Sequence, residues 1–443
     1  MEKFIIEGGK KLKGSISVSG SKNVALKALV AACLTQEKVL IKNIPLISDF
    51  TVMADIIRGF GGVVEIKDHT AVIQMKKIKD NKMSLDKAAA VRTSAMFMAP
   101  LLVRNRKAMI PNPGGCRIGA RPIDRIIDGL RKMGVEATYN SRDGYFHLEV
   151  PGEMKGVEYK FNKNTHTGTE TLILAAVLSR GKTILKNAAA EPEVDDLINL
   201  LNSMGAKIKR VKTRTIVIDG VKKLKGTTYE IPPDRNEIVT LAVAAVLTKG
   251  DIFVKNVNSK GLSEFLKLFD ACGGGFQEEK NGIRFYYKGS ISATNIETSF
   301  YPGFMTDWQG PWAVLMTQAK GISTLHETIY ESRFGYVDDL EKMGARIKFF
   351  NPKVNDPEKI YNFNYADNRP EHKHAIEICG GVKFHNAVVD VSDLRAGATL
   401  VLAALTASGQ TVIFGVEHLD RGYEQFEKRL KALGADIERI REI

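Results

Sequence analysis

Cysteine is scarce in this 443-residue sequence, and no two cysteines lie close together. The four that occur, Cys33, Cys116, Cys272 and Cys379, include no CxxC pair, so the sequence favours neither a disulfide framework nor a zinc knuckle. Aspartate and glutamate are not gathered as in a magnesium site. We therefore expect reduced thiols and no obligatory metal ion.

Long hydrophobic runs and the common nucleotide-binding motifs are also missing. No stretch approaches the ~20 apolar residues that cross a bilayer, and the opening MEKFIIEGGKKLKG lacks the hydrophobic region of a signal peptide. There is no Walker loop, no GxGxxG after a strand, no HExxH and no GxSxG. These absences predict a cytoplasmic protein with no membrane span and no bound cofactor.

Positive charge is abundant but dispersed. The formal net charge is +13 at pH 7, yet Lys and Arg form no basic tail and accompany no stacking-aromatic motif of the RNA-recognition type. Because a nucleic-acid surface concentrates its cations, we expect small anionic substrates and no nucleic acid.

A sixfold repeat is the strongest organisational signal. A helical pattern that ends in a hydrophobic residue and a glycine, followed by a β-like run, recurs with its first glycine at Gly61, Gly134, Gly205, Gly273, Gly344 and Gly434. The last interval is the longest because it contains a polar excursion over residues 350–375. Each repeat also has an Ala-rich helix that is apolar nearly all round, which predicts one buried helix, one half-exposed helix and several strands per repeat.

Six repeats divide naturally into two sets of three. The boundary is expected near Pro232 and Pro233, and a ligand site is expected in the cleft between the two sets. The alternative is that the repeats are only stacked packing units without a shared site.

Polar residues at the starts of the buried helices argue for a site. A helix N-terminus has unpaired N–H groups and a partial positive charge, so cations placed there build anion sites, although each residue alone could be a simple cap. Three arginines outside this pattern, Arg121, Arg333 and Arg421, can bind phosphate or carboxylate in bidentate fashion. The residues at the helix starts are Lys22, Asn23, Arg92, the HTGTE stretch from His166, Asp234, Arg235, Asp307, Asp393 and Arg395.

Cys116 lies in NPGGCRIGARPID, residues 112–124, among glycines and beside Arg117 and Arg121. Exposed N–H groups and nearby guanidiniums can lower a thiol pKa, which suits an acid or a nucleophile. Most free cysteines are small buried hydrophobes, but the glycine-rich setting favours the reactive interpretation. Pro122 is expected to take the first position of the next helix.

This loop, with SGSKN at 19–23, TDWQ at 306–309, SDLRAGA at 392–398 and HLDRGYE at 418–424, resembles the UDP-N-acetylglucosamine 1-carboxyvinyltransferases of the EPSP synthase superfamily. The resemblance spans nearly the whole chain. It implies an α/β (α+β) fold, a two-lobed inside-out α/β barrel of six βαβαββ-type repeats. The first lobe would be 22–232, and the second would combine 1–21 with 233–443, so that the N-terminal strand completes the C-terminal lobe.

The resemblance also implies the reaction and its residues. The family transfers the enolpyruvyl group of phosphoenolpyruvate to the 3′-hydroxyl of UDP-N-acetylglucosamine, the first committed step of peptidoglycan synthesis. Cys116 would be the general acid, the site of a covalent phosphoenolpyruvate adduct and the target of fosfomycin, and Asp307 would accept the hydroxyl proton. Lys22, Arg121 and Arg421 would hold phosphoenolpyruvate, with Arg333, Asp393 and Arg395 close by. Contacts to the UDP-sugar would come from Asn23, Arg92, Arg121, Pro122, Ile123, Asp124, Lys163, His166, Thr167, Asp307 and Ile329.

Two departures from the family pattern bear on the acceptor. Ile126 stands where a histidine near the uracil is common, and Lys27 stands where proline is usual. Transfer to a different acceptor therefore remains an alternative. So does a basic nucleic-acid-binding or regulatory protein without catalysis, which retention of Cys116, Asp307, Lys22 and Arg421 disfavours.

Overall fold

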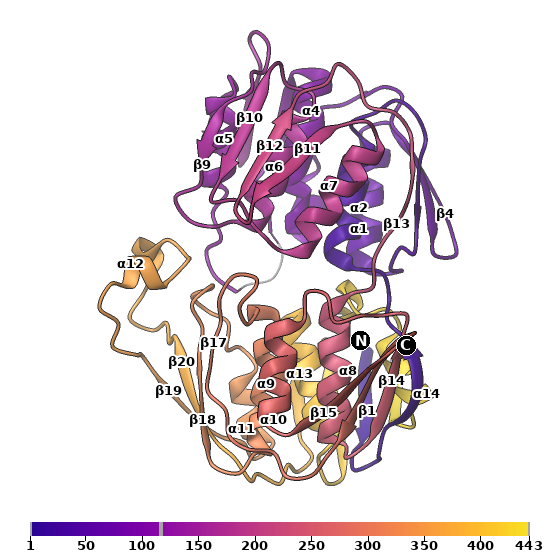
Figure 1. Ribbon diagram of the computed structural model, residues 1–443, viewed down its shortest axis with the longest axis vertical. Coiled ribbons are helices and arrows are strands. Elements are labelled where there is room, and N and C mark those ends of the chain that lie inside the picture. Colours follow the sequence, from indigo (N-terminus) through magenta and orange to yellow (C-terminus); the bar gives the residue numbers. More distant parts are fainter. Residues whose placement is uncertain (1, 115–117, 442–443) are drawn as a thin grey trace. The chain divides into compact units, whose positions relative to one another are not determined.

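The structure, a computed structural model, describes residues 2–114 and 118–441, which form two compact units. Unit 1 comprises residues 2–19, 118–121 and 233–441, and unit 2 comprises residues 20–114 and 122–232. The described residues contain six sheets, three in each unit, and Figure 1 shows helices packed against the sheets of each unit.

One repeat of unit 2 shows the common plan. Its strand order is β11-β12-β10-β9, with β9 parallel to β10 and the other neighbours antiparallel. The chain order alternates strands and helices before a final hairpin, which confirms the predicted βαβαββ repeat. The elements are β9 (Glu158–Lys160), α6 (His166–Ala176), β10 (Lys182–Lys186), α7 (Pro192–Ser203), β11 (Lys207–Lys212) and β12 (Thr215–Asp219).

The other two repeats of unit 2 differ from this plan in the strand that corresponds to β9. In one, the parallel strand beside β3 is β13 (Thr228–Glu230), from the far end of the unit. In the other, it is reduced to a parallel bridge between Lys82 and Met109. Their remaining elements are α1 (Lys22–Ala32), β3 (Val39–Lys42), α2 (Ser48–Gly59), β4 (Val63–Lys67) and β5 (Thr70–Gln74), then α3 (Leu85–Ala90), η1 (Arg92–Phe97), α4 (Met98–Asn105), β6 (Lys107–Pro111), α5 (Asp124–Lys132), β7 (Glu136–Asn140) and β8 (Tyr145–Glu149).

Unit 1 repeats the plan three times. Its first two sheets are ordered β15-β16-β14-β2 and β17-β18-β20-β19. Their elements are β2 (Lys13–Ser17), α8 (Arg235–Leu247), β14 (Asp251–Lys255), α9 (Ser263–Ala271), β15 (Gly274–Glu279) and β16 (Gly282–Tyr287), then β17 (Ile296–Glu297), η2 (Thr306–Trp308), α10 (Gln309–Thr317), β18 (Ile322–His326), α11 (Val337–Lys342), β19 (Arg346–Phe350) and β20 (Ala375–Cys379).

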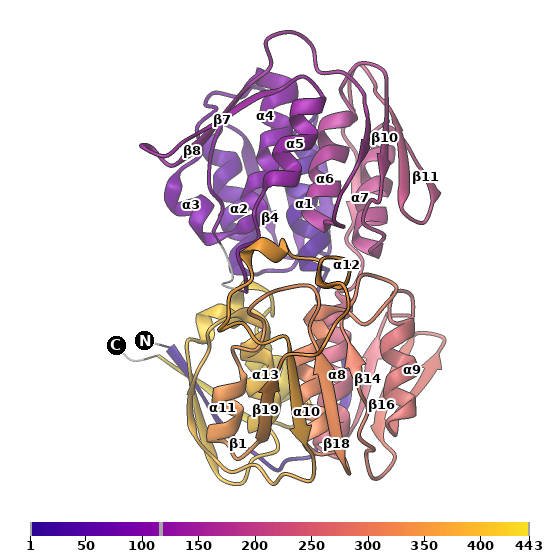
Figure 2. The same ribbon diagram turned by 90° about the vertical axis from the view of Figure 1, so that its left-hand side faces the viewer.

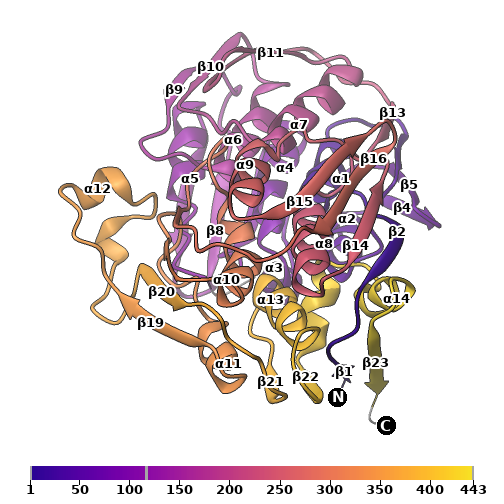
Figure 3. The same cartoon turned by 60° about the horizontal axis from the view of Figure 1, so that its bottom comes forward.

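The third sheet of unit 1 contains the first strand of the chain. The order is β21-β22-β1-β23, so β1 (Glu2–Glu7) lies between β22 and β23 and pairs with both in antiparallel fashion. Figure 3 shows β1 beside β23. The other elements are β21 (Val388–Asp390), α13 (Leu394–Ala404), β22 (Gln410–Phe414), η4 (Val416–Arg421), α14 (Phe426–Ala432) and β23 (Asp436–Arg441).

The Ala-rich helices are inner helices, as predicted. Every residue of α8 is buried, and α8, α10 and α13 contact one another in the interior of unit 1. The outer helices bury one stripe, which in α5 includes Ile126, Ile127 and Leu130. Each outer helix is followed by one of the six recurring glycines, whose φ angles of +92° to +102° favour glycine.

The expected start of α5 at Pro122 is wrong. The helix begins at Asp124, with Ile123 as its N-cap. Arg121 takes a left-handed φ of +47° just before the proline, so Pro122 belongs to the turn that leads into the helix.

The polar excursion joins β19 to β20 and contains α12 (Pro357–Ile360) and η3 (Tyr365–Asp367) (Figure 2). Its aromatic rings pack on one another: Tyr361 stacks on Phe363 and Tyr365 and makes a tilted contact with His374. Asn362 N–H donates to the carbonyl of Thr328 at 2.8 Å, which ties the excursion to the loop after β18. No helix in the described ranges is long and apolar enough to cross a membrane.

Candidate active site

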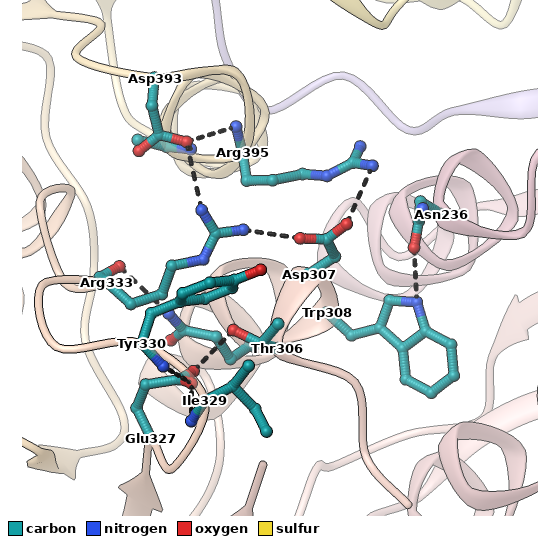
Figure 4. Close-up of polar contacts among 12 residues, drawn as sticks. Asn236, Thr306, Asp307, Trp308, Glu327, Ile329, Tyr330, Arg333, Asp393 and Arg395 are labelled. Carbon is teal, nitrogen blue, oxygen red and sulfur yellow. Dashed lines mark hydrogen bonds and ion pairs between the residues drawn. The ribbon is translucent and has the colours of Figure 1, made fainter. Parts of the chain in front are cut away.

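The inner helices of unit 1 bring their polar N-terminal residues together. Asp234 caps α8, Asp307 lies in η2 before α10, and Asp393 caps α13. Asp393 accepts the N–H groups of Arg395 and Ala396. Because the three helices contact one another, residues that recur far apart in the sequence share one region (Figure 4).

Asp307 lies between two guanidiniums (Figure 4). Arg333 Nη2 is 2.7 Å from Asp307 Oδ1, and Arg395 Nη2 is 3.4 Å from Oδ2. Arg333 Nη1 also lies 3.7 Å from Asp393 Oδ1. The Arg333 side chain is 4% exposed and that of Asp307 is 28% exposed, so the pair is largely shielded but the carboxylate is accessible. The structure thus joins four of the predicted site residues in one ion network.

The charges around Asp307 decide its protonation. Burial by itself raises its pKa, but Arg395, Arg333 and Arg235 outweigh this effect and lower the pKa to about 2. The carboxylate is therefore ionised at neutral pH and weakly basic while the guanidiniums remain beside it. An anion that binds those guanidiniums increases its basicity.

Glu327, which the sequence did not single out, supports this network from the loop 327–333. Its carboxylate accepts the N–H groups of Ile329 at 2.8 Å and Tyr330 at 3.1 Å, and the hydroxyl of Thr306 at 2.8 Å. Burial raises its pKa, and these donors partly offset the rise. Glu327 thereby fixes the loop that carries Ile329 and Arg333 to the residue that precedes Asp307.

Arg121 joins the same loop from the segment 118–121. Its guanidinium lies over the ring of Tyr330 at 5.2 Å, and that of Arg333 lies near the same ring at 5.8 Å. Both guanidiniums therefore lie near the same aromatic ring. Cys116 lies outside the described residues.

Arg395 has a second set of partners that sequence reasoning missed. Its Nη1 donates to the hydroxyl of Tyr423 at 3.1 Å, and the Tyr423 hydroxyl shares a hydrogen bond of 2.8 Å with that of Thr240.

Arg421 is the last residue of η4, and the residue before it, Asp420, pairs with Arg439 at 2.6 Å. The sequence offered one signal for the contact between Arg395 and Tyr423: the tyrosine lies two residues after Arg421, within the HLDRGYE motif.

The predicted site residues of unit 2 lie at helix starts or in the turns just before them. Lys22 begins α1 and pairs with Asp49 at 2.7 Å, Asn23 follows it, and Arg92 begins η1. Lys163 precedes α6, Pro122 and Ile123 form the turn before α5, and Asp124 begins α5.

His166 is the first residue of α6, ahead of Thr167, and its environment is charged. Its Nε2 lies 3.1 Å from Glu170, whose other oxygen is 3.3 Å from Lys27. Burial alone lowers the pKa of His166, but Glu170 reverses this and raises it. Lys27, the unusual residue at its position, is thus the partner of a buried carboxylate. The described residues contain no group of three or more His, Cys, Asp or Glu that could hold a metal ion.

Comparison with known proteins assigns the chain to a family. Residues 6–430 match the model of the EPSP synthase (3-phosphoshikimate 1-carboxyvinyltransferase) family. Curated relatives include the UDP-N-acetylglucosamine 1-carboxyvinyltransferases of Koribacter versatilis, 39% identical over 100% of this chain and 98% of the relative, and of Magnetococcus marinus, 42% identical over 99% and 100%.

Two solved structures share the fold. The enolpyruvyl transferase NikO from Streptomyces tendae has a TM-score of 0.85 at 22% identity and covers 100% of this chain and 99% of its own. EPSP synthase from Acinetobacter baumannii has a TM-score of 0.73 at 18% identity, with 100% of both chains covered. The chain is a transferase that belongs to the EPSP synthase family and, within it, to the UDP-N-acetylglucosamine 1-carboxyvinyltransferases.

Proposed function

We propose that the protein transfers the enolpyruvyl group of phosphoenolpyruvate to the 3′-hydroxyl of UDP-N-acetylglucosamine and releases phosphate. This is the first committed step of peptidoglycan synthesis, and it would occur in the cytoplasm on two small-molecule substrates, without nucleic acid. The observation that carries the proposal is full-length identity of about 40% to relatives with this name.

The reaction needs an acid and a base. Protonation of the methylene carbon of phosphoenolpyruvate makes the adjacent carbon electrophilic, the sugar hydroxyl adds there, and loss of phosphate and a proton restores the double bond. We assign the acid to Cys116 and the base to Asp307. The ion network supports the second assignment, because a substrate anion that engages Arg395 or Arg333 also increases the basicity of Asp307.

The other assigned residues bind charge. Lys22, Arg121 and Arg421 hold the phosphate and carboxylate of phosphoenolpyruvate. Arg333 pairs with Asp307 and Asp393, and Arg395 pairs with Asp307, so these charges keep one another in place. Fixed cations beside developing anions supply transition-state stabilisation at little reorganisation cost. The UDP-sugar is assigned to Asn23, Arg92, Pro122, Ile123, Asp124, Lys163, His166, Thr167 and Ile329.

Phosphate release tests the proposal. We expect release only when phosphoenolpyruvate and UDP-N-acetylglucosamine are both present, with mass spectrometry showing the enolpyruvyl product. Asp307→Asn should lower kcat by about 10²–10⁴. Phosphate release with another acceptor in place of UDP-N-acetylglucosamine would contradict the assigned substrate, and no release with any acceptor would contradict the activity.

The thiol assignment has its own test. Burial raises the pKa of Cys33 to about 12 and that of Cys272 to about 11, so both should resist alkylation at pH 8. Fosfomycin, an epoxide, should instead add to Cys116, as read by peptide mass spectrometry. Cys116→Ser should abolish both the adduct and turnover, whereas Cys379→Ser should change neither.

A further inference from the structure

One buried carboxylate near the site has no role in the proposed chemistry. Glu331 is 2% exposed, and neither of its carboxylate oxygens makes a hydrogen bond of good geometry with the described residues, although the N–H groups of Glu331 and Ala120 act on it. Burying a carboxylate without such partners is costly, so its place in the loop 327–333 calls for a physical reason.

The segment 118–121 lies directly against Glu331. A Cβ atom at Gly119 would be 1.9 Å from Glu331 Oε2, so the backbone of residue 119 touches the carboxylate. Ser332 N–H donates to the carbonyl of Ile118 at 3.3 Å, and Arg121 lies over the Tyr330 ring. Three successive contacts therefore set the segment along residues 330–332, with Glu331 in the middle.

The polar excursion supplies the other charges around Glu331. Burial raises the pKa of the carboxyl, the N–H group of Glu331 itself lowers it, Asp367 of the excursion raises it, and His372 of the excursion and the Ala120 N–H lower it. The hydrogen bond from Asn362 to Thr328 holds the excursion against this loop. Glu331 is thus in contact with the segment 118–121, and two residues of the excursion act on its charge.

We propose that Glu331 is a positioning residue that seats the segment 118–121 on the loop 327–333 and so fixes the guanidinium of Arg121 where it binds substrate anions. The effect on substrate rests on the proposed function, whereas the seating of the segment does not. The requirement for glycine at 119 follows, because any side chain there would displace either the segment or the Glu331 carboxylate.

Hydrogen exchange tests the seating without any assay of activity. In Glu331→Ala, amide exchange in a peptide that covers residues 118–121 should be at least tenfold faster than in the wild type. Glu331→Gln, which keeps the size of the side chain, should restore most of the protection. Glu371→Gln, an exposed carboxylate on the excursion, is the matched control and should exchange like the wild type. Unchanged exchange in Glu331→Ala overturns the proposal.

A double-mutant cycle tests the link to Arg121. Gly119→Ala and Glu331→Ala should each raise KM for phosphoenolpyruvate about tenfold with a smaller change in kcat, as expected for lost substrate binding. The effect of Gly119→Ala should shrink in the Glu331→Ala background, because the collision is gone and only the strain of the φ of +147° remains. Faster exchange with an unaltered KM, or independent effects of the two substitutions, overturns the link. A wild-type protein without turnover would contradict the proposed function and leave the exchange result to decide the seating.

Discussion

Replacing Arg333 with methionine should destabilise unit 1 by about 3 kcal/mol. Methionine fills similar space but removes the charge that faces Asp307 at 2.7 Å and Asp393 at 3.7 Å. Breaking one side of a buried ion pair costs about 3–5 kcal/mol. The lower end applies because Asp307 is 28% exposed and keeps Arg395 as a partner. For a domain of this size, the midpoint of thermal unfolding should fall by roughly 6–12 °C.

Tryptophan fluorescence provides an assay that is specific to unit 1. The chain has two tryptophans, Trp308 and Trp312, and both are buried in unit 1. Urea unfolding followed by their emission therefore reports this unit alone, and a lower midpoint with an unchanged slope gives the loss of stability. Arg369→Met is the matched control, because Arg369 is 70% exposed and its loss should cost less than about 0.5 kcal/mol.

A double variant distinguishes charge from packing. In Arg333→Met the Asp307 carboxylate loses its closest cation, so adding Asp307→Asn should cost less than it does in the wild type. The difference, a coupling energy of about 1–2 kcal/mol, belongs to the pair. An Arg333→Met protein within 0.5 kcal/mol of the wild type, or strictly additive effects of the two substitutions, would refute the reasoning.

Three further predictions concern buried charge, packing and pH. Lys27→Met leaves Glu170 without its lysine partner and should cost about 3 kcal/mol by calorimetry, part of which Lys27→Met/Glu170→Gln recovers. Gly129→Ala places a Cβ atom 2.3 Å from a methyl group of Leu172 and should lower the stability by about 1–3 kcal/mol. Gly152→Ala, with open space around the new Cβ atom, should leave the stability unchanged. Equal unfolding temperatures for the two variants would contradict the predicted clash. The pKa of Asp307 falls from an ordinary 3.8 to about 2 on folding, so its stabilisation of about 2 kcal/mol is present above pH 4 and is lost as the pH falls through 2. The unfolding curves of wild type and Asp307→Asn should therefore converge in acid.

Features that depend on local pattern could be predicted from the sequence. Gly205 and Gly434 mark helix ends because residues other than glycine rarely adopt the positive φ angles found there. A single glycine in the sequence is therefore enough to indicate the helix end. Likewise, Asp307 and Asp393 could be recognised because a buried, apolar helix does not require a charged residue at its start, so the charge indicates a binding site. Recurrence at matching positions predicted that they share a site, and the structure brings both of them to Arg333 because the inner helices contact one another.

Contacts between repeats could not be predicted in the same way. Thr240 and Tyr423 are 183 residues apart, and no local sequence pattern around either residue predicts their hydrogen bond. Glu331 resembles any loop carboxylate in sequence, and only its burial against Gly119 distinguishes it. The start of α5 was misplaced because proline is common at the first position of a helix, whereas here Arg121 is left-handed and Pro122 lies in the turn before the helix.

The interior position of β1 has a consequence for biosynthesis. β1 leaves the ribosome about 400 residues ahead of β22 and β23, so its sheet cannot be completed until they are made, and at about 5–20 residues per second this takes roughly 20–90 s. Residues 20–232, in contrast, emerge early enough for unit 2 to fold while translation continues. During that wait Phe4 and Ile6, fully buried in the finished protein, stay uncovered, and the charged Glu2, Lys3 and Glu7 around them oppose premature strand pairing with other nascent chains.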